Sequence, residues 1–271
     1  MKQLKNYSRL LGFLYNNELE FIEEISIIER MYIYPDIAVF VDDPDNIAGF
    51  LLIQRNHLGN VSAYIKTGEN PELLCDIVGT LKEMPKVHIQ CDKYEKDYLK
   101  NNLPVKGEYK YQIMIPDESR FNPVLEPVPV PITVHLPRSD LDELSNGNGD
   151  RFREEVRHGI FYGFKMDDKW VSMAGAGVIS ENYMYLYVWT GRASRGKGYG
   201  RAVVSYCMED IFKSGKKPVY ALDPLNDPSM KIAHKFGFVP FMMKECLFSG
   251  DWALKRDKSD DESIPDSSFY C

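Results

Sequence analysis

Apolar and polar positions change period often along the chain, and this predicts many short helices and strands. Apolar residues at helical spacing predict one or two helices over about residues 5–32, with Asn16 and Asn17 as a break. Runs of β-branched and aromatic residues, bounded by turn formers such as those at 42–46, predict strands. In chain order these are strands at 37–41, 47–54 and 60–66, a helix at 72–84, a strand at 87–91, a helix at 94–99 and a strand at 109–115.

A proline-rich stretch divides the pattern into two parts. Its prolines, at 123, 127, 129 and 131, alternate with apolar residues, which suits neither a helix nor a central strand, so we predict an extended connector at 121–131. Beyond it the pattern predicts a strand at 132–136, a helix starting near Ser139, a flexible loop at 146–150, a helical turn at 150–157, a hairpin of 159–165 and 169–179, a strand at 183–189, a helix around 203–211, a strand at 219–222, a helix at 230–236 and a strand at 239–248.

Length and composition are those of a globular protein. The 271 residues leave room for two domains, and 44% of them are hydrophobic and 27% charged. No apolar run approaches the roughly twenty residues of a membrane span. Residues 1–7 lead into charged helical sequence and not into the apolar core of a signal peptide. We therefore expect a cytoplasmic location and no membrane partner.

The cysteines, the histidines and the net charge argue against a disulfide framework, a metal site and a nucleic-acid partner. Five scattered cysteines without C-x-x-C spacing predict reduced thiols and not a disulfide framework. The five histidines show no metal-ligand spacing, so we expect no metal. The formal charge of -7 at pH 7 argues against nucleic acid as a partner and is compatible with a cationic amine substrate.

A glycine-rich turn between a strand and a helix carries the most chemical content. It reads Arg195-Gly196-Lys197-Gly198-Tyr199-Gly200-Arg201 and follows the uncharged run 183–189. Glycines allow positive φ and the close approach of a ligand, and a helix N-terminus offers free N–H groups and a positive dipole end. The turn is therefore predicted to hold a phosphate or pyrophosphate. A tight turn that binds nothing is the alternative.

Two nucleotide-binding motifs fit this turn poorly. Residues 191–197 match G-x-x-x-x-G-K, but Gly198 stands where a P-loop needs Ser or Thr to hold magnesium. The dinucleotide fingerprint G-x-G-x-x-G also fails, because Arg201 stands in the place of its third glycine.

The turn resembles the acyl-coenzyme A loop of the GNAT N-acetyltransferase superfamily, whose pattern Arg/Gln-x-x-Gly-x-Gly/Ala corresponds to residues 195–200. A second signature of that superfamily is Asn-x-x-Ser/Ala followed by a short helix ending in Lys-x-Gly-Phe, and residues 226–238 are similar to it. Thr190 and Ser229 resemble the residues of one bacterial branch. The two signatures stand in the right order and concern roughly the last half of the chain.

The N-terminal half has the element order of the GNAT fold as well, so we expect a duplication. The resemblance implies an α+β fold with two GNAT-like domains in tandem, each a mostly antiparallel mixed sheet flanked by helices. In place of the anion loop, residues 66–72 of the first copy hold one glycine and two carboxylates, which would repel a pyrophosphate. We expect a degenerate, non-catalytic domain at 1–120, the linker at 121–131, a catalytic domain at 132–255 and an acidic tail at 256–271.

The resemblance also implies which residues bind the coenzyme. In GNAT folds the strands before and after the loop splay apart, and the pantetheine arm pairs with the backbone of the first, here at Val188 and Thr190. The pyrophosphate lies on the N–H groups of the loop, with charge added by Arg195 and Lys197. The full set expected to bind acetyl-coenzyme A is Val188, Thr190, Arg195, Gly196, Lys197, Gly198, Tyr199, Gly200, Arg201 and Asn226.

The catalytic residues are less well defined. Ala233 stands where many relatives have a Tyr as general acid, and the strand before the loop holds no Glu as base. His234, next to it, is expected to point to another face of the helix. Asp223 is the candidate for binding or deprotonating an amine, with capping of the following turn as its alternative role. Ser229 is the candidate for contact with the thiol, with a helix-start role as its alternative.

The resemblance implies an N-acetyltransferase that moves the acetyl group of acetyl-coenzyme A to a primary amine by direct attack. The acceptor is a small molecule or a peptide whose identity the motifs do not give, and an oligomer is compatible with the sequence. One alternative is transfer of a longer acyl group. Another, motivated by Ala233 and by the lack of a carboxylate in the strand before the loop, is a catalytically weak acyl-coenzyme A-binding or sensing module. The tail is expected to be solvated unless Phe269 and Tyr270 dock on the body or on a partner.

Overall fold

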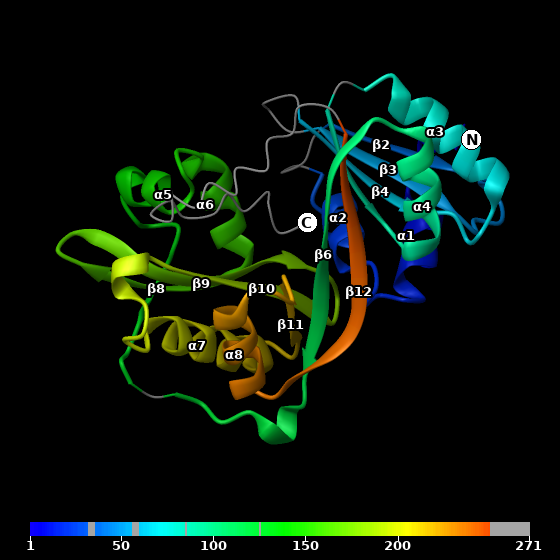
Figure 1. Cartoon of the computed structure of the whole chain (residues 1–271). Coiled ribbons are helices and arrows are strands. Elements are labelled where there is room, and N and C mark those ends of the chain that lie inside the picture. Colours follow the sequence, from blue (N-terminus) through cyan, green and yellow to red (C-terminus); the bar gives the residue numbers. More distant parts are fainter. Residues whose placement is uncertain (32–35, 56–59, 85, 125, 250–271) are drawn as a thin grey trace. The chain divides into compact units, whose positions relative to one another are not determined.

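The computed structural model describes residues 1–31, 36–55, 60–84, 86–124 and 126–249 (Figure 1). They form two compact units. Unit 1 comprises residues 1–111 and 243–249, and unit 2 comprises residues 112–242.

Unit 1 is a mixed sheet with helices on both faces. β4 and β5 are parallel, whereas the other described strand pairs of this unit are antiparallel. In order across the sheet, the strands are β1 (Lys2–Gln3), β2 (Ile37–Val41), β3 (Phe50–Arg55), β4 (Val61–Lys66), β5 (Val87–Cys91), the end of β12 (Phe238–Ser249) and the first part of β6 (Val105–Pro116). The helices are α1 (Ser8–Tyr15), α2 (Ile22–Glu29), α3 (Pro71–Lys82) and α4 (Lys93–Asn102).

Alternate residues of β3 face two different helix pairs. Leu51 and Ile53 belong to a core that includes the apolar faces of α3 and α4. Phe50 points the other way and contacts Phe21, at the start of α2, with ring centroids 5.8 Å apart. Both sheet faces are therefore covered, as the apolar strand sequences require.

Unit 2 repeats this design (Figure 1). β10 and β11 are parallel, and the other described pairs in this unit are antiparallel. Across the sheet the strands are the end of β6 (Val105–Pro116), then β11 (Lys217–Leu222), β10 (Tyr183–Thr190), β9 (Lys169–Ile179), β8 (Ile160–Met166) and β7 (Val130–Pro131). Helices α5 (Arg138–Leu144) and α6 (Gly149–His158) cover one face, and α7 (Tyr199–Lys213) and α8 (Asp227–Lys235) cover the other.

Strand β10 is buried on both faces because its side chains alternate between two cores. Met184 and Leu186 pack with α7 and α8. Tyr187 and Trp189 pack with α5 and α6. This is why the run 183–189 carries no charge.

The elements follow the predicted order, with two corrections. The predicted strand at 132–136 is wrong, because β7 ends at Pro131 and the chain then turns, with the Leu136 N–H donating to the Thr133 carbonyl at 3.2 Å. Pro137 is the N-cap residue of α5, so the helix starts at Arg138, before Ser139, and the turn must be completed in five residues. The predicted loop at 146–150 is shorter than expected, because α6 begins at Gly149.

Each unit completes its sheet with a strand from the other half of the sequence. Residues 245–249 of β12 pair with β5 in unit 1, and residues 112–114 of β6 pair with β11 in unit 2. The compact units therefore divide within β6 and β12, whereas the predicted boundaries lie at 120/121 and 131/132. Those sequential limits stay a prediction, and the predicted tail at 256–271 lies outside the described residues.

Candidate active site

Strands β10 and β11 run together and then part. They pair from Tyr183 with Lys217 to Leu186 with Tyr220. Beyond that point β10 pairs with β9, and β11 pairs with β6 on its far side. Within the described residues, no strand pairing covers the β11 side of Val188 and Thr190. The pairing between β10 and β11 therefore ends at Leu186.

The turn after β10 is built by two glycines in the left-handed region. Gly196 has φ +77° and Gly198 has φ +89°. Gly198 is the N-cap residue of α7, and neither a side-chain cap nor an acidic residue serves the first turn of this helix. The first helical bond runs from the Ala202 N–H to the Gly198 carbonyl at 3.0 Å. The N–H groups before Ala202 therefore point toward a site where an anion is favoured.

Gly200 lies at the point where the predicted coenzyme residues meet. A Cβ atom added there would lie 2.9 Å from Thr190 Oγ1, 3.5 Å from Ile232 Cδ1 and 3.8 Å from Val188 Cγ2. β10, α7 and α8 thus converge on one backbone position. Only a glycine fits this contact without a shift of its neighbours.

Ser172 supports this point from β9, and it lies outside both sequence signatures. Its hydroxyl lies 2.9 Å from Thr190 Oγ1 and donates to the Trp189 carbonyl at 3.0 Å. Ser172 is fully buried. It orients Thr190 at the end of β10, and nothing in its local sequence signals this role.

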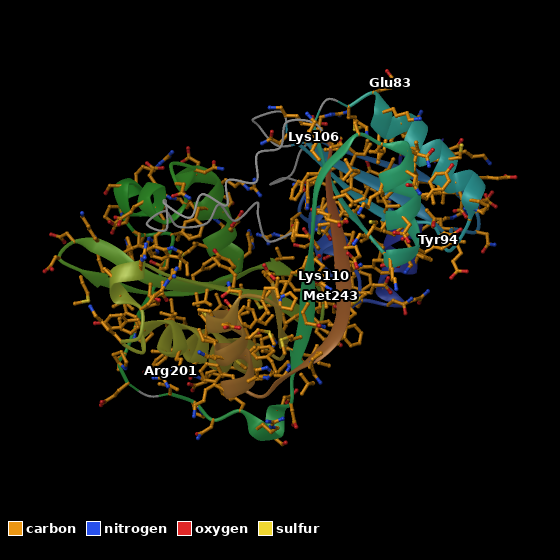
Figure 2. The ribbon with its side chains drawn as sticks, in the orientation of Figure 1. Glu83, Tyr94, Lys106, Lys110, Arg201 and Met243 are labelled. Carbon is orange, nitrogen blue, oxygen red and sulfur yellow. The ribbon has the colours of Figure 1, made fainter. Side chains whose placement is uncertain are left out.

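The basic side chains of the turn are exposed, and one of them braces it. Arg195 Nε donates to the Thr190 carbonyl at 3.1 Å. Lys197 and Arg201 are exposed, and Figure 2 shows Arg201 at the surface of unit 2. Tyr199 turns toward β8, where its ring lies 4.9 Å from that of Phe164, so its contribution to the turn is its backbone N–H.

The second signature forms a capped helix start. Asn226 Oδ1 accepts the Ser229 N–H at 3.3 Å and caps α8. Asp223 Oδ1 accepts the Leu225 N–H at 2.9 Å, and the Asp223 carbonyl accepts the Asn226 N–H at 2.8 Å. The alternative structural roles of Asp223 and Ser229 are both present, and they order the turn between β11 and α8.

Ala233 and His234 lie on different faces of α8, as predicted. Ala233 is fully buried in the core shared by α7 and α8, whereas His234 is exposed. Ala233 supplies no acid, and its burial leaves the proton donor for a departing thiolate to another group.

The corresponding place in unit 1 is occupied by the chain itself. β4 and β5 pair as far as Tyr64 with Gln90. Just beyond, Glu95 Oε1 accepts both the N–H and the hydroxyl of Thr67, at 3.0 and 2.9 Å. Asn70 Oδ1 then accepts the first two N–H groups of α3 that can donate, at 3.0 and 3.1 Å, because Pro71 has none. An anion finds no free helix N-terminus here.

Comparisons with known proteins agree with this architecture. Residues 131–238 match the family model described as "Acetyltransferase (GNAT) family". A solved Drosophila protein matches with a TM-score of 0.65 and 12% identity over 90% of each chain. An acetyltransferase from the GNAT family of Colwellia psychrerythraea matches with a TM-score of 0.55 and 12% identity, over 92% of this chain and 98% of that one. A tandem GNAT protein from the clavulanic acid biosynthesis pathway matches with a TM-score of 0.57 and 12% identity, over 79% and 82%. No curated protein matches.

Residues 131–238 therefore form a GNAT-type domain by their match to that family model, and the predicted α+β fold with two GNAT-like domains is confirmed. Among the described residues, no helix has the length and apolar character needed to cross a bilayer. No group of three or more His, Cys, Asp or Glu side chains in that part of the chain could hold a metal ion. The expected location and oligomeric state stay predictions.

Proposed function

We propose that unit 2 binds acetyl-coenzyme A and transfers its acetyl group to a primary amine of a small molecule or peptide. The observation that carries the proposal is the meeting, at Gly200, of an uncapped helix N-terminus with the end of β10 where it parts from β11. The first feature suits a pyrophosphate and the second suits an extended arm. Unit 1, whose equivalent N–H groups are capped, is proposed to be non-catalytic.

Each predicted residue then has a defined task. The N–H groups of residues 199–201 bind the pyrophosphate, with Gly196 and Gly198 shaping the turn, while Arg195, Lys197 and Arg201 add positive charge. Val188 and Thr190 bind the pantetheine arm through their backbone. Asn226 orders the start of α8, where Ser229 meets the thiol, and Asp223 binds the acceptor. Acetyl-coenzyme A supplies the activated acyl group.

Coenzyme binding tests the site directly. We expect Gly198→Asp to weaken the binding of acetyl-coenzyme A, measured by calorimetry, by at least about 100-fold, because it sets a carboxylate against the pyrophosphate. Gly215→Asp is the matched control, since Gly215 also has positive φ, at +81°, at the other end of α7 and in open space. Equal affinities of the two variants for the coenzyme would contradict the proposal.

Thiol release then separates the transferase from the alternatives. We expect release with acetyl-coenzyme A and at least one member of a panel of alkyl amines, amino acids and aminoglycosides. Tight coenzyme binding with no release from any amine would favour the sensing module, which Ala233 and the lack of a carboxylate in the strand before the loop motivate. Faster release from longer acyl-coenzyme A thioesters would favour the acyltransferase alternative.

A further inference from the structure

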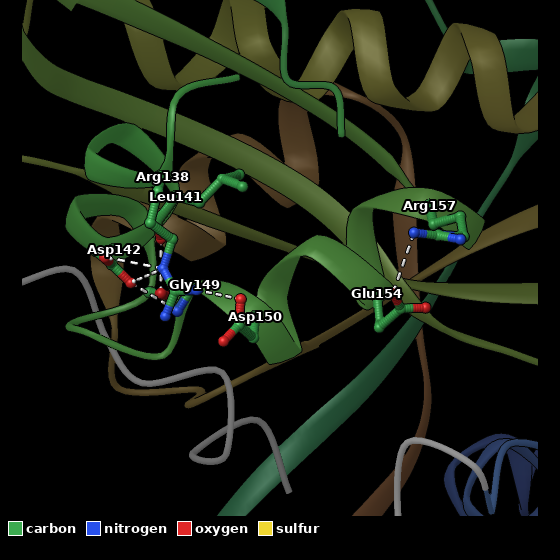
Figure 3. A network of polar contacts seen from close by, with 8 residues as sticks. Arg138, Leu141, Asp142, Gly149, Asp150, Glu154 and Arg157 are labelled. Carbon is green, nitrogen blue, oxygen red and sulfur yellow. Dashed lines mark hydrogen bonds and ion pairs between the residues drawn. The ribbon is translucent and has the colours of Figure 1, made fainter. Parts of the chain in front are cut away.

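Helix α6 carries charged side chains on two different faces. On the solvent face, Arg157 and Glu154 form an exposed ion pair at 3.2 Å, and Arg138 of α5 binds Asp142 and Asp150 (Figure 3). Of these contacts, the pair of Arg138 with Asp150 links α5 to α6. Glu155 faces the sheet, and only 5% of it is exposed. A carboxylate buried to this degree needs a reason, because leaving water is costly for a charge.

The side chain of Glu155 lies against Gly177, a residue of β9 that has no side chain. A Cβ atom added to Gly177 would lie 3.7 Å from Glu155 Cβ, 3.8 Å from its Oε2 and 3.2 Å from Phe161 Cζ. Arg151 Nε, one turn earlier on α6, lies 3.2 Å from Glu155 Oε1. The missing side chain at 177 is what lets the carboxylate approach the sheet.

Gly177 of β9 lies beside the point at which the pairing of β10 with β11 ends. Tyr187 pairs with Gly175 and Tyr185 with Val178, so the bulge sets Ala176 and Gly177 opposite Leu186. Leu186 is also the last β10 residue that pairs with β11. From Thr190 to Leu186 the strand covers about 13 Å. A thioester on an arm that enters at Thr190 would end near Leu186, which lies beside the Gly177 backbone that Glu155 contacts.

A similar short sequence occurs in unit 1, where a primary ammonium lies near it. Phe21-Ile22-Glu23-Glu24-Ile25 shares its Phe and two Glu residues with Phe152-Arg153-Glu154-Glu155-Val156. The first segment begins at the N-cap residue of α2, and the second lies within α6. Glu24 is as buried as Glu155, and burial raises the pKa of Glu24 to about 7 against the opposing charge of Lys244. The ammonium of Lys244 lies 5.4 Å from the centre of the Phe21 ring. Unit 1 thus pairs this motif with an alkyl ammonium of its own.

We propose that Glu155 binds the protonated amino group of the acceptor and removes one proton from it. This inference rests on the proposed function. The proton passes from the ammonium to a carboxylate oxygen of Glu155 and later leaves to solvent. The neutral nitrogen attacks the thioester carbon, the new C–N bond forms, the C–S bond breaks, and the second proton lost by the nitrogen goes to the sulfur. A cationic primary amine is the substrate class that this arrangement selects.

The test compares Glu155→Gln with Glu154→Gln, its exposed neighbour. The readout is thiol release from acetyl-coenzyme A with the fastest primary alkyl amine of the panel and with hydroxylamine, which is already neutral at pH 7. We expect Glu155→Gln to lower kcat for the alkyl amine by at least about 100-fold. For the same variant, the fold-decrease in kcat with hydroxylamine should be at least tenfold smaller than that with the alkyl amine. The residual kcat of the variant with the alkyl amine should rise with pH. Glu154→Gln should match the wild type.

Coenzyme calorimetry on the same proteins separates the two proposals. A wild-type protein that does not bind acetyl-coenzyme A overturns the proposed function and this inference with it. A wild-type protein that turns over amines while Glu155→Gln keeps its kcat, or loses equally with both nucleophiles, overturns this inference alone. If Glu155→Gln does not fold, Glu155→Asp takes its place, and the same preferential loss with the alkyl amine is required.

Discussion

Gly200 is the single residue on which the geometry of the site depends most. Three elements reach it, and the position of Thr190 Oγ1 leaves no room for a methyl group. Thr190 is in turn held by Ser172. The motif predicted the glycine from its backbone freedom, but its φ is ordinary. Its need for a glycine comes from a side chain ten residues earlier, which the local sequence cannot reveal.

We expect Gly200→Ala to lower the free energy of unfolding by about 1–3 kcal/mol, because Thr190 must move. In the helix interior of α3, Gly79 has open space around its Cβ position, so Gly79→Ala should raise this free energy by up to about 1 kcal/mol. Urea denaturation measures both. Adding Thr190→Ala to Gly200→Ala should remove most of the loss. A stabilising Gly200→Ala in the wild-type background would contradict the contact.

Helix α2 buries two carboxylate side chains. Its residues from Ile22 to Ile28 are all buried, including Glu23 and Glu24. Glu23 accepts the Tyr64 hydroxyl at 2.8 Å and the Gln90 side-chain amide at 3.0 Å. The apolar spacing predicted the helix correctly. It could not show that the two carboxylates face inward, because their partners come from distant strands.

The buried Glu24 makes the stability of unit 1 depend on pH. Burial raises its pKa from 4.5 to about 7, while Lys244 opposes this rise and Glu23 and Glu20 add to it. The folded state therefore holds this proton more tightly than the unfolded state. The resulting stability is fully present below pH 4.5 and is lost as the pH rises through 7. Its size is up to about 3 kcal/mol.

Glu24→Gln should remove this dependence. We expect the free energy of unfolding of the wild type, minus that of the variant, to fall between pH 4.5 and pH 8. Urea denaturation at several pH values measures the difference, in which other titrating groups cancel. One such group is His88, whose pKa burial lowers to about 4. A difference that stays constant, or rises with pH, would show that Glu24 is charged at little cost.

At the scale of the whole molecule, the sequence predicts the order of the elements. It does not predict which sheet the strands β6 and β12 complete. The predicted strands at 109–115 and 239–248 lie within β6 and β12, although β6 begins earlier, at Val105. Which sheet each part of them completes depends on backbone pairing between residues more than a hundred positions apart. Glu245 pairs with Cys91, and Leu222 pairs with Gln112. The segment 121–131 was predicted to be a boundary because its prolines suit neither a helix nor a central strand. Compact units are instead defined by strand pairing, and the segment itself contributes β7 to the sheet of unit 2.

Because each unit contains a strand from the other half of the sequence, we expect that neither half of the chain folds alone. A chain of residues 1–128 lacks β12, including Leu247, which is fully buried in the unit 1 core. A chain of residues 129–271 lacks β6, including the equally buried Met114 of the unit 2 core. Loss of one such side chain costs about 2–5 kcal/mol against a total stability of about 5–15 kcal/mol, and each half loses a strand of them.

A protease site inserted after Val128, which is exposed, tests this in the intact protein. After cleavage we expect the two pieces to elute together in gel filtration and to keep their coenzyme affinity, because neither sheet has lost a strand. Separated in urea and refolded one at a time, each piece should give no cooperative unfolding transition, and mixing should restore it. Cooperative folding of either piece alone would contradict this prediction and would favour sequential domains at 1–120 and 132–255. The core of that piece would then be stable without the strand, β6 or β12, that the other piece supplies.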